Sequence, residues 1–183
     1  MDNFIVLYNP LAGNGTAQDK MLELESLMQG DSLYFSNMLD IRDYGAFFND
    51  MPDGASIIIC GGDGTLNRFL NDTEDIRPDC DIYYYPSGSG NDFARDIGAE
   101  RNKPPVLISR YIERLPEICV NGTVHRFING IGYGIDGYCC EKGDELRGKG
   151  DGEVNYTAIA IKGLLFHYKP TGATITVDGV EHR

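Results

Sequence analysis

Three short apolar runs, each followed by a glycine-containing turn and a helix-like segment, constrain the fold of this chain most strongly. The runs are FIVLY at residues 4–8, SIIIC at 56–60 and DIYYYP at 81–86. Their β-branched and aromatic residues favour strands. Strands that alternate with helices predict an α/β fold on a parallel sheet that is covered on both faces. Ligands of such sheets bind beyond the carboxyl ends of the strands, so we expect all three turns at one ligand-binding edge.

The pattern changes near Ile118. Asn121-Gly122 lies between two apolar stretches and predicts a β-hairpin, and the alternating stretch ATITV leads to a second tight turn at Asp178-Gly179. We therefore predict an α/β domain over residues 1–117 and the beginning of a β-rich domain over 118–183. Since ATITV has almost no return strand before the sequence ends, an edge would stay unpaired. We expect that the sequence is a fragment or that another segment supplies the partner strand.

The composition predicts a soluble, cytoplasmic protein with a packed core and no nucleic-acid partner. Hydrophobic residues make up 42% and charged residues 24% of the 183 residues, which is typical of globular proteins. The net charge of −12 lacks the basic face of a duplex-binding protein and disfavours broad attraction to an anionic membrane. No stretch approaches the ~20 apolar residues of a membrane span. The five cysteines show no CxxC spacing and indicate reduced thiols, and Cys139 and Cys140 are expected in a strand.

A glycine-rich stretch, CGGDGTLNRFLND, follows the second apolar run directly. Three glycines surround one carboxylate in it: Gly61, Gly62, Gly64 and Asp63. Glycines let backbone N–H groups approach a phosphate, and a following helix presents its positive end. Thr65 can cap this helix or bond a phosphate oxygen, whereas Asp63 would repel a phosphate unless Mg²⁺ or a hydroxyl lies between them. A tight strand-to-helix turn with Asp63 as a local cap explains the same pattern, and this stretch alone leaves both interpretations open.

Two further stretches favour phosphate binding. PSGSGNDFARDIG at residues 86–98 again places glycines between a strand and a helix, with Asn91 or Asp92 at the expected cap. Residues 9–17 make a third glycine-rich turn, which is not a dinucleotide-binding fingerprint because Gln18 replaces the third glycine. Two glycine-rich anion nests at one sheet edge are less expected by chance than one.

Other chemistries find little support in the sequence. GDELRGKG at residues 143–150 approaches a Walker A loop, but Gly150 replaces the required Ser or Thr and no apolar strand precedes it. The three histidines have no metal-ligand spacing. Ser89 lacks a nucleophile elbow, because Ser87 stands where the first glycine is needed.

The stretches NPLAGNGTA, GGDGTLNRFLND, PSGSGNDFARDIG and NGIGYGIDGY, in this order, resemble the catalytic domain of the diacylglycerol kinase family. That family includes bacterial lipid kinases and sphingosine kinases, and the resemblance covers most of the chain. The glycine-aspartate-glycine loop is shared with NAD kinases and phosphofructokinases, whereas SGSGNDFAR is much more specific to lipid kinases. The resemblance implies a nucleotide-binding α/β domain over 1–117, followed by a β-sandwich that is truncated in this chain, with ATP in the cleft between them.

The resemblance also implies roles for individual residues. The nucleotide would be bound by Asn9, Gly61, Gly62, Gly64, Thr65, Ser89, Gly90 and Asn91. Asp63 would hold the metal and take part in catalysis. Asp136, in GIDG, would face the acceptor hydroxyl, although a turn aspartate before Gly137 explains the same pattern. Three residues depart from the family's pattern: Arg68 replaces a usual glutamate, Asp72 a common glycine and Ser89 a common threonine.

These expectations describe an ATP- and Mg²⁺-dependent lipid kinase that transfers the γ-phosphate to a lipid hydroxyl, such as that of diacylglycerol, at the membrane surface. The alternatives are a NAD kinase-like or other small-molecule kinase and a non-catalytic nucleotide-binding fragment. Peripheral membrane attachment and a homodimer through the unpaired edge stay open. We expect this chain alone to have little or no kinase activity, because the family's β-sandwich, with its usual general-base aspartate, continues past Arg183.

Overall fold

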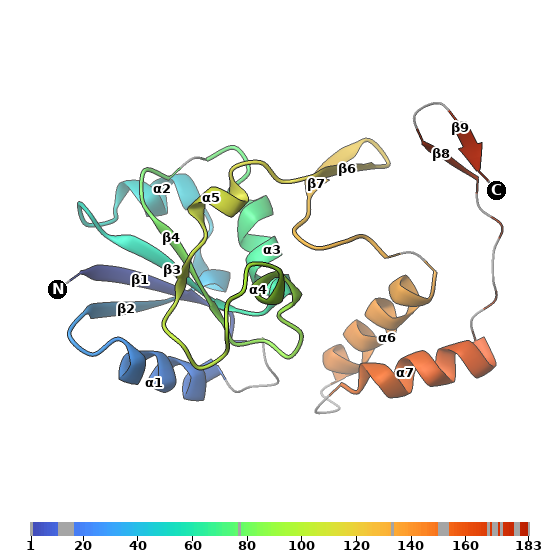
Figure 1. Cartoon of the computed structure of the whole chain (residues 1–183), viewed down its shortest axis with the longest axis horizontal. Helices are drawn as coiled ribbons and strands as arrows, with labels where there is room; N and C mark the ends of the chain where they lie inside the picture. Colours follow the sequence, from blue (N-terminus) through green and yellow to red (C-terminus); the bar gives the residue numbers. More distant parts are fainter. Residues whose placement is uncertain are drawn as a thin grey trace. The chain divides into compact units, whose positions relative to one another are not determined.

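The structure is a computed structural model, which describes residues 2–10, 17–76, 78–132, 134–149, 154–167, 169, 172, 174–177 and 180–182. The chain divides into two compact units, Met1–Gly130 and Ile131–Arg183. Figure 1 shows the whole chain, coloured from the N-terminus to the C-terminus.

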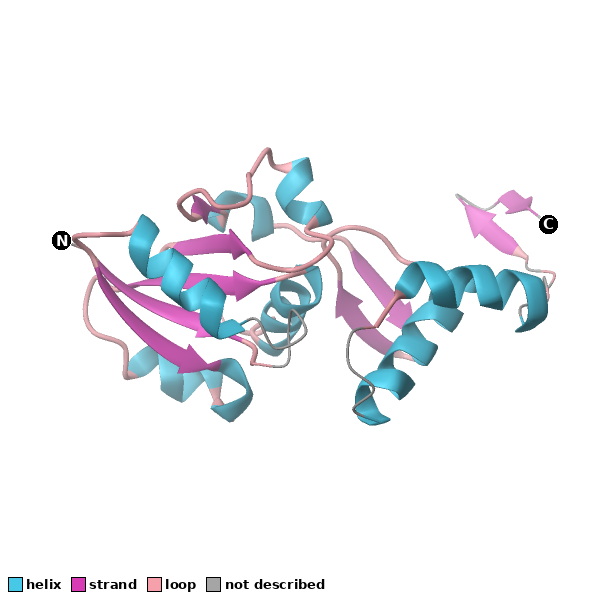
Figure 2. Ribbon diagram, turned by 90° about the horizontal axis from the view of Figure 1, so that it is seen from below, coloured by secondary structure: helices cyan, strands magenta, loops and turns pink. Residues whose placement is uncertain are grey.

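A five-stranded sheet forms the centre of the first unit. Its strands, in the order β2-β1-β3-β4-β5, are β1 (Asn3–Tyr8), β2 (Ser32–Asn37), β3 (Ser56–Gly61), β4 (Ile82–Pro86) and β5 (Val106–Leu107). The first four strands are parallel and β5 is antiparallel to β4. Their parallel arrows run side by side in Figure 2. The predicted α/β fold with a parallel sheet is confirmed, as are the strands expected at 4–8, 56–60 and 81–86.

Helices cover both faces of this sheet. They are α1 (Ala17–Leu27), the 3₁₀ turn η2 (Met38–Asp40), α2 (Tyr44–Asn49), α3 (Asp63–Asp72), α4 (Asp92–Asp96) and α5 (Ser109–Ile112). Successive strand residues point to opposite faces. One face therefore packs Val6, Ile58 and Tyr85 against Leu24 of α1.

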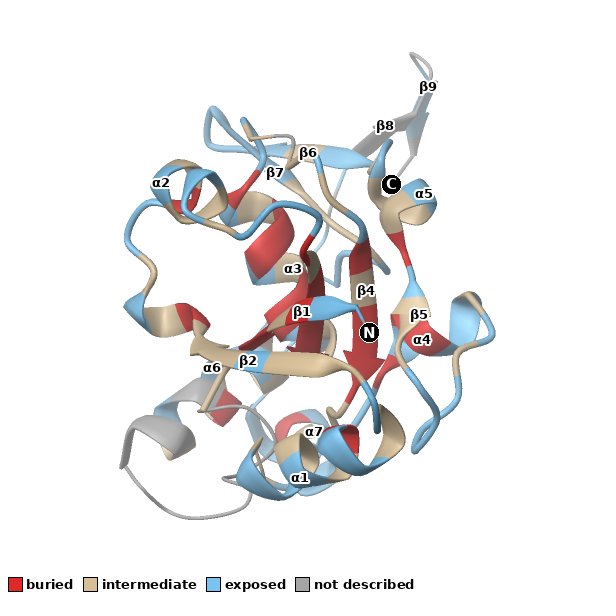
Figure 3. Ribbon diagram, turned by 90° about the vertical axis from the view of Figure 1, so that its left-hand side faces the viewer, coloured by how far each residue is buried: buried red, intermediate tan, exposed pale blue. Residues whose placement is uncertain are grey.

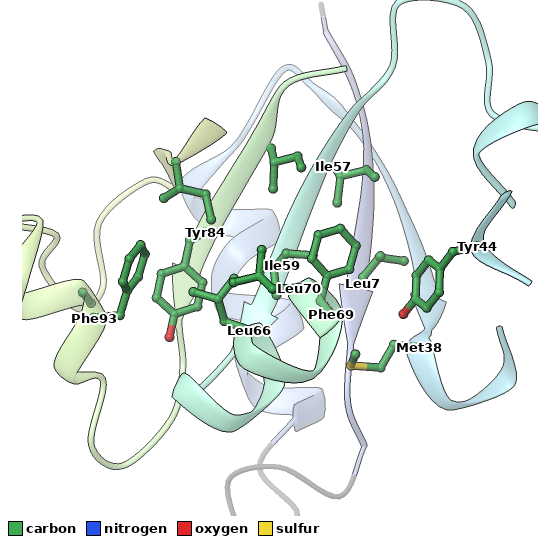
Figure 4. Close-up of a cluster of buried hydrophobic side chains, with 13 residues drawn as sticks. Leu7, Met38, Tyr44, Ile57, Ile59, Leu66, Phe69, Leu70, Tyr84 and Phe93 are labelled. Carbon is green, nitrogen blue, oxygen red and sulfur yellow. The ribbon is translucent and has the colours of Figure 1, made fainter. Parts of the chain in front are cut away.

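The opposite face of the sheet packs against α3. Leu7, Ile59 and Tyr84 lie in one buried cluster with Leu66 and Phe69 (Figure 4). Figure 3 shows buried residues concentrated in the central strands and on the sheet-facing side of α3. Because β3 and α3 are both held in this core, the turn that joins them has a fixed place at the sheet edge.

A β-hairpin follows the sheet and is anchored to α3. It consists of β6 (Glu117–Val120) and β7 (Thr123–Arg126), joined by Asn121 and Gly122 with φ of 52° and 88°, as a type I′ turn requires. Asn71 Nδ2 donates to the Arg126 carbonyl and the Arg126 N–H donates to Asn71 Oδ1, both at 2.9 Å. The predicted hairpin is confirmed. The compact units divide after Gly130, and the predicted domains, 1–117 and 118–183, stay a prediction.

Replacing Asn71 should release this hairpin from α3. Asn71→Ala removes both bonds to Arg126 and the bond from Asn71 Nδ2 to the Asn67 carbonyl, at a cost of about 1–3 kcal/mol. We expect faster hydrogen exchange at the Arg126 amide and unchanged exchange in β3. Equal exchange at Arg126 in the variant and the parent would contradict this anchoring role.

The second unit contains more helix than the sequence predicted. Its elements are α6 (Ile135–Lys149), α7 (Tyr156–Lys162), the π-helical turn η3 (Gly163–His167), β8 (Ile175–Val177) and β9 (Val180–His182). The prediction of Cys139 and Cys140 as strand residues is wrong, because both lie in α6. Helix packing explains the difference. The Tyr138 ring of α6 packs directly on Gly163, the first residue of η3, where a Cβ would lie only 2.6 Å from the ring.

The chain end also differs from the expectation. β9 pairs with β8 in an antiparallel ladder, so the prediction that ATITV lacks a return strand is wrong. The Asp178-Gly179 turn lies outside the described residues. The predicted truncated β-sandwich is not confirmed.

Candidate functional site: two glycine-rich loops at one sheet edge

The two glycine-rich loops lie together at the carboxyl edge of the sheet. β3 ends at Gly61 beside Pro86, the last residue of the parallel strand β4, and the Ser87 N–H donates to the Gly61 carbonyl at 2.9 Å. Asn9 follows Tyr8, which is paired with Cys60 at the same edge. Residues 11–16 of the third turn lie outside the described residues. The predicted meeting of the 61–65 loop with the 86–98 loop is confirmed.

Glycines allow the backbones of the two loops to touch. A Cβ on Gly88 would lie 2.4 Å from the Gly62 Cα, and a Cβ on Gly62 would lie 3.1 Å from the Gly88 Cα. A Cβ on Gly61 would lie 2.4 Å from the Cβ of the buried Thr65. These glycines are therefore required by packing between the loops and within the turn. Gly64 differs, because a Cβ there meets nothing within 4 Å, and its backbone is open to a ligand.

Asn91 closes the second loop from inside. It adopts the left-handed conformation, with φ of 57°, and is only 3% exposed. Its Oδ1 accepts the Gly88 N–H at 3.0 Å, and its Nδ2 donates to the Gly88 carbonyl at 2.9 Å. Asparagine tolerates this conformation better than most residues. The side chain of Asn91 thus holds the loop, and contact of this residue with a nucleotide stays a prediction.

Asp63 connects the first loop to the helix that follows the second. Its Oδ2 accepts the Asp92 N–H and its Oδ1 accepts the Phe93 N–H, both at 3.0 Å. These amides open α4, whose N-cap residue makes no side-chain capping bond. The N-cap of α3 itself is Gly62, also without a side-chain cap. Asp63 therefore caps the neighbouring helix across the site and not its own turn.

The amino end of α3 supplies amide donors at this edge. The N–H groups of Thr65 and Leu66 donate to the Gly62 carbonyl at 3.0 and 3.1 Å. Those of Asp63 and Gly64 lie at the open end of the helix, where the first amides have no intrahelical acceptor and the helix dipole is positive. This end suits an anion. The nucleotide role predicted for Thr65 stays a prediction, because its side chain is buried against Gly61.

A second carboxylate, Asp92, which the sequence analysis considered only as a helix cap, lies beside Asp63. A Cβ on Gly90 would lie 3.3 Å from Asp63 Oδ2 and 3.9 Å from Asp92 Oδ2, and Asp92 also pairs with Arg95 at 2.8 Å. The described residues contain no group of three or more metal-binding side chains. Mg²⁺ in phosphate sites uses one or two carboxylates together with substrate phosphates. Asp63 and Asp92 are the carboxylates at this edge that would hold such an ion.

Two of the departures from the family's pattern pair with each other. Arg68 Nε lies 3.3 Å from Asp72 Oδ2 on the exposed surface of α3. An exposed pair contributes about 0–1 kcal/mol. The reversed charge of Arg68 is thus offset within its own helix.

A buried thiol lies directly before the first loop. Burial raises the pKa of Cys60 from its ordinary 9.0 to about 11, and its Sγ lies 3.7 Å from Ser87 Oγ. As the pH rises, the thiol of the unfolded chain loses its proton before the buried thiol does, which favours the unfolded state. The free energy of unfolding therefore keeps the contribution of the protonated thiol below pH 9.0 and loses it as the pH rises towards about 11.

This titration should be measurable. Between pH 9 and 10 the free energy of unfolding should fall by up to about 1.4 kcal/mol more in the parent chain than in Cys60→Ala. Urea unfolding at both pH values measures the difference. Parallel losses in the two proteins would contradict the assignment.

Asp136 lies in the second unit, in the first turn of α6. Its side chain packs directly against Gly132, where an added Cβ would lie 2.6 Å from Asp136 Oδ2. The predicted role facing an acceptor hydroxyl stays a prediction.

The chain also matches a known protein family. The model of the diacylglycerol kinase catalytic domain matches residues 3–118, which include both loops. The chain belongs to the diacylglycerol kinase catalytic domain family. A Staphylococcus haemolyticus protein named "Putative lipid kinase" is 26% identical over 160 residues, which make up 84% of this chain and 48% of that protein. The chain therefore spans about half the length of this curated relative.

A solved structure shares the fold of this chain. It is a "putative diacylglycerol kinase" from Bacillus anthracis str. Sterne, with a TM-score of 0.50 and 20% identity, over 99% of this chain and 61% of that one. Among the described residues, none of the helices has both the length and the apolar character needed to cross a membrane.

Proposed function

We propose that the whole protein is a lipid kinase that transfers the γ-phosphate of ATP to a lipid hydroxyl, such as that of diacylglycerol. The observation that carries this proposal is the Asp63 carboxylate, which joins the two family loops by accepting the Asp92 and Phe93 amides. The family match over residues 3–118 supports the same reaction class. Asp63 thereby makes two glycine-rich loops into one site for the phosphates of a nucleotide.

Positioning and electrostatics would dominate catalysis at this site. Phosphoryl transfer places charge on the oxygens of the transferred group, which oriented amides and cations stabilise. Amides of Asp63 and Gly64 at the start of α3 would bind one side of the phosphate chain. Ser89 and Gly90, both exposed in the second loop, would bind the other.

Asp63 and Asp92 would hold the Mg²⁺ of the bound nucleotide through the carboxylate oxygens that border Gly90. A bound Mg²⁺ supplies neutralisation of the phosphate charge. Because each Asp63 oxygen already accepts one amide, the carboxylate is held in one orientation towards the nucleotide. Asp136 stays our candidate for the residue that orients the acceptor hydroxyl.

An acceptor panel tests the proposed reaction. The whole protein would be incubated with Mg-ATP and diacylglycerol, a sphingoid base or NAD, with the lipids in mixed micelles. We expect phosphate incorporation into a lipid. Phosphorylation of NAD alone would favour the small-molecule kinase alternative, and nucleotide binding without transfer to any acceptor would favour a non-catalytic module.

A further inference from the structure

An arginine outside the glycine-rich motif holds the second loop from its outer side. Arg101 Nη2 donates to the Gly88 carbonyl at 2.9 Å and to the Ser89 carbonyl at 2.5 Å. Arg95 Nη2 donates to the next carbonyl, that of Gly90, at 3.1 Å. Three successive carbonyls are thus drawn towards guanidinium groups. Arg101 reaches back 12 residues or more to make its two bonds.

These bonds, together with the bond from Asn91 Nδ2 to the Gly88 carbonyl, fix the direction of the loop amides. In a trans peptide the C=O of one residue and the N–H of the next point in opposite directions. With the Gly88 and Ser89 carbonyls bound to Arg101, the N–H groups of Ser89 and Gly90 point away from it. Both residues are exposed, and two successive amides that face one way can donate to the same anion.

We propose that Arg101 is a positioning residue for nucleotide binding, which sets the peptide planes of 88–90 so that the Ser89 and Gly90 amides donate to a phosphate oxygen. The inference rests on the proposed function. In this role Arg101 acts through the loop amides and not as a direct phosphate ligand. Arg95 contributes less to the orientation of the loop, since its Nη2 bonds only the Gly90 carbonyl and also pairs with Asp92 at 2.8 Å.

Amide NMR of the whole protein during titration with Mg-ATP, and separately with inorganic tripolyphosphate, tests this role. In the parent protein, the Ser89 and Gly90 amides should shift on binding. Arg101→Met should weaken binding about tenfold, equivalent to the loss of one or two hydrogen bonds, and should abolish these two shifts. In the kinase assay the KM for ATP should rise more than kcat falls.

Two further variants separate orientation from charge. Arg101→Lys keeps the charge but lacks the fixed guanidinium fork, so it should restore only part of the affinity. Arg114→Met removes an equal charge from an exposed side chain. Arg114 lines a cavity together with Ile82, which begins β4, whereas the glycine-rich loop follows the other end of that strand. This variant should bind like the parent.

Four results would overturn the inference. The first is an affinity of Arg101→Met for Mg-ATP equal to that of the parent. The second is full recovery of this affinity in Arg101→Lys, which would show that the charge alone is needed. Triphosphate binding by the parent without shifts at Ser89 and Gly90 would overturn the positioning role and leave the proposed kinase function standing. No triphosphate binding by the parent would overturn both.

Discussion

Asp63→Asn should lower phosphoryl transfer by the whole protein at least about a hundredfold while the sheet stays folded. The carboxylate accepts two amides that open α4 and borders the glycine where a metal would lie. Asparagine has one acceptor oxygen, and its NH₂ group would face one of the two amide donors. We therefore expect turnover to collapse and hydrogen exchange at Asp92 and Phe93 to accelerate.

A matched control is available on the same helix. Asp72→Asn makes the same chemical change at an exposed aspartate that pairs only with Arg68 among the bonds described, and it should keep nearly normal turnover. Near-normal turnover in a well-folded Asp63→Asn protein would reduce Asp63 to a turn residue. If Asp63→Asn loses turnover but leaves amide hydrogen exchange at Asp92 and Phe93 unchanged, the role of Asp63 would be metal binding alone.

Gly88→Ala should separate the two loops. The added methyl group would lie 2.4 Å from the Gly62 Cα and 2.8 Å from Asn91 Oδ1, and backbone atoms cannot rotate aside. Overpacking of this kind costs about 1–3 kcal/mol, which urea unfolding would measure. Nucleotide affinity should fall at least about tenfold, because the loops would no longer face one ligand together.

Gly64→Ala provides the control for stability. It adds the same methyl group in the first turn of α3, where nothing lies within 4 Å of it, and alanine favours a helix over glycine. This variant should be as stable as the parent or more so. Equal stabilities of Gly88→Ala and the parent would show that the loops do not depend on their close backbone contact.

The strands that carry the site could be predicted because their residues are continuously apolar. Ile57, Ile58 and Ile59 are fully buried, as expected for a sheet covered on both faces. The edge strand β2, SLYFSN, was missed because it is only half-buried and mixes polar with apolar residues. α6 was missed because glycines and the Asn-Gly turn signals before it favoured strands, whereas its packing depends on contacts between Tyr138 and Gly163.

The meeting of the two loops followed from topology, but their chemistry did not. Parallel neighbours must end at one edge, so Gly61 and Ser87 could be placed together. The capping of α4 by Asp63 joins residues 29 and 30 positions apart. The residues around Asp63 and around Asp92 do not by themselves predict these bonds. The bonds of Arg101 could not be predicted either, because this residue lies outside the glycine-rich stretch at 86–98.

A crystal structure of the whole protein with Mg²⁺ and a non-hydrolysable ATP analogue tests the central claim most directly. We predict the terminal phosphates between the α3 amides of Asp63 and Gly64 and the loop amides of Ser89 and Gly90, with Mg²⁺ on Asp63. The claim would be contradicted by a nucleotide bound elsewhere, for example in the cavity of about 540 Å³ that Phe69, Ile82 and Ile112 help to line, with both glycine-rich loops free of phosphate.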